Sequence, residues 1–147
     1  MEFTELVAAF AQRHAVEGLV PQDGQISLDI DGIPVTLVET GDHLAACAEI
    51  GEPPAEGRAA FADLLLEANL ESSSYFAKTR ETGNYVLVRR LSLARLDPDA
   101  FDAAMENLVN AAETWRRLLA DFRPAANAAA ANDASAPSFG QGGFMQV

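Results

Sequence analysis

The sequence predicts an α+β fold in which helices pack a twisted antiparallel sheet, in the order helix, three strands, helix, two strands, helix. The first observation is a strict alternation of apolar and polar residues on both sides of Asp31-Gly32, which predicts a β-hairpin. The second is the return of apolar residues at helical spacing near the start of the chain and again after Asp97. With 147 residues the chain has the length of one domain.

The N-terminal segment has the spacing of an amphipathic helix that ends near Gly18. Its apolar face is expected to carry Phe3, Leu6, Val7, Phe10 and His14.

The register of the first hairpin follows from its two-residue turn. Such a turn pairs Ile30 with Ile33, Leu28 with Val35 and Ile26 with Leu37, and places all six side chains on one face. Pro34 then lies opposite Asp29 and directs its missing N–H away from the first strand. We therefore expect the third strand, residues 43–50 after a turn at Thr40-Gly41-Asp42, to pair beyond Pro34.

The second half of the chain predicts a helix, a hairpin and a long final helix. The middle helix starts near Ala55 and ends at Asn69, a residue that tolerates a left-handed cap. Strands over 75–79 and 84–91 flank the turn at Glu81-Thr82-Gly83. Asp97-Pro98 then begins the last helix, because an N-cap carboxylate precedes a proline at the first helical position.

The composition changes at residue 124, where alanine, glycine and small polar residues take over. Such a segment buries too little apolar area to offset chain ordering. We expect an α+β domain over residues 1–123 and an Ala/Gly-rich flexible tail over 124–147. Phe139, Phe144 and Met145 in that tail are either plain disorder or an anchor for a groove.

Charge and cysteine content exclude several classes of protein. The formal net charge of −12 argues against a nucleic-acid partner. The single Cys47 cannot form an intrachain disulfide, which indicates a reducing compartment. The start of the chain lacks the pattern of a signal peptide, and no stretch has the length of a membrane span. We expect a cytoplasmic bacterial protein with no membrane insertion.

The chain offers few groups for catalysis. His43 and Cys47 are four residues apart on a predicted strand, too far for a hydrogen-bonded dyad, and Cys47 reads better as core. Neither a CxxC nor an HxxxH pair is present. We therefore expect no enzyme, no metal and no cofactor, since an enzyme or small-molecule carrier would need convergent polar groups.

The middle helix closes as Asp63-Leu64-Leu65-Leu66-Glu67-Ala68-Asn69-Leu70. With the order of elements and Trp115 near the end of the last helix, this segment resembles the type III secretion chaperones of the Tir-chaperone (CesT-like) family, over Phe3 to Phe122. Two features depart from that pattern: Glu71-Ser72-Ser73-Ser74 replaces a glycine-rich link, and the tail is longer. The resemblance implies a homodimer that holds the N-terminal region of a secreted effector extended before export, without ATP or catalysis.

Two candidate surfaces follow. The leucine run offers side chains in three directions, so part of it needs a partner; the expected dimer interface is Leu64, Leu66, Leu70, Val86 and Val88. Extended peptides bind sheet edges and apolar pockets; the expected effector-binding residues are Phe3, Val7, Phe10, Leu37 and Val38. For Phe3, Phe10 and Leu37, a place in the ordinary core is the alternative to client contact. A regulatory adaptor of the same fold, binding a folded partner or a secretion-apparatus component, is the alternative function.

Overall fold

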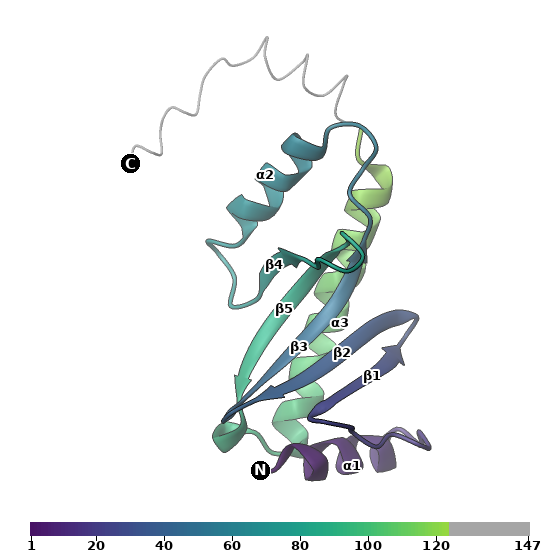
Figure 1. Ribbon diagram of the computed structural model, residues 1–147, viewed down its shortest axis with the longest axis vertical. Helices are drawn as coiled ribbons and strands as arrows, with labels where there is room; N and C mark the ends of the chain where they lie inside the picture. The colour runs from purple at the N-terminus through teal and green to yellow at the C-terminus, as the bar shows by residue number, and fades with distance from the viewer. Residues whose placement is uncertain (124–147) are drawn as a thin grey trace.

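The computed structural model describes residues 1–123, and the predicted tail over 124–147 lies outside the described residues (Figure 1). The order of elements is the predicted one, with a short 3₁₀ helix added before the last helix. The elements are α1 (Phe3–Arg13), β1 (Gln25–Ile30), β2 (Ile33–Thr40), β3 (His43–Gly51), α2 (Arg58–Ala68), β4 (Tyr75–Lys78), β5 (Tyr85–Ser92), η1 (Leu93–Arg95) and α3 (Pro98–Asp121).

The five strands form one antiparallel sheet in the order β1-β2-β3-β5-β4, which leaves β1 and β4 at its edges. The predicted register of the first hairpin is confirmed, including Asp29 opposite Pro34. Asp31 and Gly32 both have positive φ, 54° and 83°, as a tight two-residue hairpin turn requires. Pairing of β2 with β3 begins at Val35, one residue beyond Pro34, as predicted.

The long helix α3 runs along one face of the sheet, while α1 crosses one end of the molecule and α2 lies beside β4 at the other (Figure 1). The N-cap of α3 is the predicted one, because the Asp97 carboxylate accepts a hydrogen bond from the Ala100 N–H at 2.7 Å. The core between α3, α1 and the sheet includes Phe3, Leu6, Val35, Leu44, Phe101 and Leu108, all buried.

The middle helix differs from the prediction at both ends. It begins at Arg58, after Gly57 in a left-handed conformation with φ of 78°, rather than near Ala55. The predicted left-handed cap at Asn69 is wrong, since its φ is −62°. The chain instead continues into a right-handed turn, and the Asn69 Oδ1 accepts a hydrogen bond from the Phe76 N–H at 2.7 Å.

Candidate functional site

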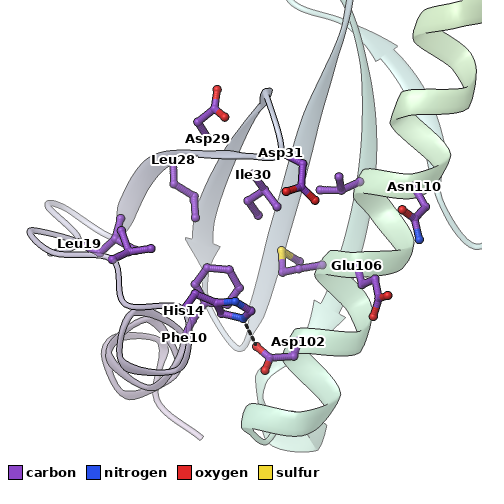
Figure 2. A pocket seen from close by; sticks show the side chains of 13 residues that line it. Phe10, His14, Leu19, Leu28, Asp29, Ile30, Asp31, Asp102, Glu106 and Asn110 are labelled. Atoms are coloured by element: carbon purple, nitrogen blue, oxygen red, sulfur yellow. Dashed lines mark ion pairs between the residues drawn. The ribbon is translucent and has the colours of Figure 1, made fainter.

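A groove of about 890 Å³ lies between α1, β1 and α3 (Figure 2). The segment that follows α1 contributes Val16 and Leu19 to its lining. The apolar lining includes Val16, Leu19, Leu28, Ile30, Met105 and Val109.

The position of β1 at the sheet edge creates this groove. Leu28 and Ile30 pair with Val35 and Ile33, so all four side chains lie on the face that carries the helices. Val35 and Ile33 are buried on the neighbouring strand β2, whereas Leu28 and Ile30 remain only half-buried. The outer strand therefore presents apolar side chains to the groove as well as an edge of backbone groups.

The rim of the groove is acidic. Asp31 comes from the hairpin turn, and Asp102 and Glu106 come from α3. Figure 2 shows the Asp102 carboxylate near the imidazole of His14, whose Nε2 lies 3.6 Å from Oδ1. At that distance no hydrogen bond forms, and Oδ1 is buried without a hydrogen-bond partner among residues 1–123.

Arg13 at the end of α1 does not line the groove but tethers α1 to α3. Its Nη1 lies 2.8 Å from Asp102 Oδ2 and 2.8 Å from Asp99 Oδ1. These hydrogen bonds, first to Asp102 and then to Asp99, raise the pKa of the Arg13 guanidinium. The guanidinium is thus occupied by the carboxylates of Asp99 and Asp102.

Four of the five predicted effector-binding residues are core residues in the single chain. Phe3, Val7, Phe10 and Leu37 are buried, while Val38 is half-buried on the opposite face of β2. Phe10 is the one member of this set that lines the groove. Val7, Phe10 and Leu37 surround a separate void of about 10 Å³ next to it, which is about the minimum size for one water.

The predicted dimer residues fall into two groups. Leu64 and Leu66 of α2 and Leu70 in the turn after it are 43%, 64% and 85% exposed, and we call these three residues the leucine ridge. Val86 and Val88 are buried on β5, but they lie on the face opposite Leu87 and outside the main core. The ridge accordingly offers far more free apolar area than the two valines.

Sequence reasoning missed most of the groove lining. The sequence predicts Leu28 and Ile30 only as members of the hairpin's apolar face, and it predicts the last helix without relating any of its residues to a groove. The available signal was the pair Val16 and Leu19, two apolar residues in a segment with no helical or strand periodicity. Such residues need a surface to pack on, which here is the groove.

Among the described residues, His43 and Cys47 do not form a catalytic dyad. His43 Nδ1 lies 2.6 Å from Asp42 Oδ1, and Cys47 is paired with Val88 further along β3. Partial burial raises the pKa of the Cys47 thiol, which lowers its reactivity. Within residues 1–123, no group of three or more His, Cys, Asp or Glu side chains is placed to hold a metal ion. No helix in that range has the length and apolar character to cross a membrane.

Fold and site together place the chain among small α+β proteins that present apolar surface on a helix-packed sheet. Its sequence matches the Tir chaperone protein (CesT) family over residues 5–116, and the chain belongs to that family. This confirms the resemblance drawn from the leucine-rich helix and the order of elements. A search of curated proteins finds no match.

Solved structures of similar fold include several protein complexes. The structure described as the ExsC-ExsE complex aligns with a TM-score of 0.70 at 26% identity, covering 81% of this chain and 97% of that chain. The HopA1-SchA chaperone-effector complex aligns with a TM-score of 0.66 at 17% identity, covering 78% of this chain and 93% of that chain. The Yersinia pestis type III secretion chaperone SycH, in complex with a fragment of YscM2, aligns with a TM-score of 0.62 at 19% identity. This alignment covers 78% of this chain and 99% of that chain. The last two similarities concern the fold.

Proposed function

We propose that this protein is a non-catalytic, ATP-independent chaperone that binds the N-terminal region of a type III secreted effector in extended form and keeps it competent for export. It acts in the bacterial cytoplasm as a homodimer. The observation that carries the proposal is the groove of about 890 Å³ beside the edge strand β1. Membership of the CesT family and the chaperone-effector complex among the similar structures support it.

An edge strand beside an apolar groove suits an extended peptide. The outer edge of β1 offers backbone N–H and C=O groups to a partner strand, and alternate side chains of that strand can enter the groove. Leu28, Ile30 and Leu19 are half-buried in the single chain and would be covered by the client. Of the residues proposed from sequence, Phe10 lies on this groove, whereas Phe3, Val7 and Leu37 would support its floor and Val38 the opposite face of the sheet.

The leucine ridge is the proposed centre of the homodimer interface. Leu66 and Leu70 are the most exposed leucines of the described chain; Leu66 lies near the C-terminal end of α2, and Leu70 lies in the turn that follows it. Burying them against the same ridge of a second copy removes apolar area from water and stabilises the pair. Leu64 would extend this contact. Val86 and Val88 would contribute from β5 once the partner covers that face of the sheet.

Replacing Leu28 by Asp tests the client site. The carboxylate places a charge inside the apolar groove, and capture of the N-terminal region of the exported protein by the purified chain should fall about tenfold or more. The matched control is Leu118→Asp, which alters a 49% exposed leucine of α3 outside the groove lining. Equal capture by Leu28→Asp, Leu118→Asp and wild-type protein would contradict the proposed site.

The same capture experiment separates the chaperone from the adaptor. A chaperone retains the isolated, unfolded N-terminal segment of one exported protein, whereas an adaptor retains only a folded partner or a component of the secretion apparatus. We expect retention of the unfolded segment. Retention of folded partners alone would favour the adaptor.

A further inference from the structure

We propose that the groove selects a basic client segment, one in which the apolar residues that enter it are accompanied by Lys or Arg side chains that meet its acidic rim. The inference rests on the proposed function of the groove and specifies the chemistry of its occupant. Shape alone would accept any apolar segment, so the discrimination comes from charge.

The first support is the uneven distribution of charge along the chain. Residues 1–57, which form α1 and the strands β1 to β3, hold eleven Asp or Glu residues and a single basic residue, Arg13. The remaining nine Arg and Lys residues all lie between residues 58 and 123, alongside ten Asp or Glu residues. The acidity of the protein is thus concentrated on residues 1–57, which supply eight of the thirteen residues that line the groove, whereas residues 58–123, which include α3, are nearly balanced in charge.

The second support is the geometry of the rim. Asp31 and Glu106 are exposed on opposite walls, one on the β1–β2 turn and one on α3, and Asp102 lies between α1 and α3. No Lys or Arg lines this groove in the described chain. The nearby Arg13 is held by Asp99 and by Asp102 Oδ2, which leaves Asp102 Oδ1 without a hydrogen-bond donor. A cationic side chain in the groove would meet the exposed carboxylates of Asp31 and Glu106.

Charge also argues against the chain's own C-terminal segment as the occupant. Residues 124–147 contain apolar Phe139, Phe144 and Met145 but no Lys or Arg, and their one charged side chain is the carboxylate of Asp133. This segment would bring negative charge to an acidic rim. A basic segment of another protein is therefore the better occupant.

A random peptide library displayed on phage tests the inference with the purified full-length protein as target. We expect enriched sequences to combine apolar residues with Lys or Arg. A synthetic peptide of the enriched sequence should bind Asp31→Asn/Glu106→Gln protein about three- to tenfold more weakly than wild type, and the difference should shrink at high salt. The control is Glu52→Gln/Glu56→Gln, which removes the same number of charges from exposed positions away from the groove.

Each outcome decides one of the two claims. Enriched peptides that are apolar without basic residues, yet lose binding in Leu28→Asp protein, would overturn the charge selection and leave the groove function standing. Enriched peptides unaffected by Leu28→Asp, or no enrichment, would count against the groove itself. If the two charge variants weaken peptide binding equally, the effect depends only on the net charge of the protein. That result would also overturn the inference.

Discussion

Asn69 connects two elements through one hydrogen bond. Its Oδ1 accepts from the Phe76 N–H at 2.7 Å and so ties the end of α2 to the first residues of β4. The contact sets where the hairpin begins after the serine-rich link at residues 72–74. The structural role of Asn69 is thus its side-chain hydrogen bond, and its backbone does not use a positive φ.

Replacing Asn69 by Ala should lower the free energy of unfolding by about 1 kcal/mol, because a partly buried N–H loses its acceptor. Chemical denaturation measures this. Asn110→Ala is the matched control, since Asn110 is an exposed helical residue whose side chain forms no hydrogen bond within residues 1–123. Equal free energies of unfolding for the Asn69→Ala and wild-type proteins would show that this hydrogen bond does not stabilise the fold.

At the scale of elements, α2 is the helix that its own domain covers least. Phe61 and Leu65 are the buried residues of α2 and lie on its inner side. Phe61 packs edge-to-face on Phe122, with ring centroids 5.0 Å apart. The leucine ridge on its other sides stays exposed. In a monomer the apolar side chains of the leucine ridge would remain in contact with water. This exposed apolar area is the physical reason to expect a second copy of the chain.

The double variant Leu66→Glu/Leu70→Glu should be a folded monomer. Multi-angle light scattering should give a mass near 15.7 kDa for the variant and twice that for wild type, because charged side chains oppose burial of the ridge. Helical content by circular dichroism should be unchanged, since both leucines are already exposed in the single chain. The control variant Leu118→Glu, which changes an exposed leucine on α3, should remain dimeric. If the double variant is also dimeric, the leucine ridge is not part of the dimer interface.

Local pattern predicted the elements better than it predicted the site. Asp31-Gly32 and the alternation around it determine the register of the first hairpin, because a one-residue shift would expose the whole apolar set. Leu28 and Ile30 belong to that set, and nothing local distinguishes them from Val35. Their partial exposure depends on β1 being the edge strand and on the path of α3, both of which are tertiary features. The conformation of Asn69 was predicted wrongly for the same reason, since its partner Phe76 lies in the next element.

At the scale of the whole molecule, the two proposed surfaces are separated. The groove lies between α1, β1 and α3, whereas the leucine ridge belongs to α2 and the turn after it, beside the opposite edge of the sheet (Figure 1). Neither surface shares a residue with the other. A dimer formed through α2 would therefore keep both grooves open, and each subunit could hold part of the same extended client.

The central claim is that the client occupies the groove and the edge of β1. Hydrogen–deuterium exchange of the full-length protein, with and without its bound client segment, tests this directly. We predict slower exchange on binding for β1 (Gln25–Ile30) and for residues 16–19, because the client covers the groove and pairs with the free edge of the strand. Protection confined to α2 and β4, with β1 unchanged, would contradict the account.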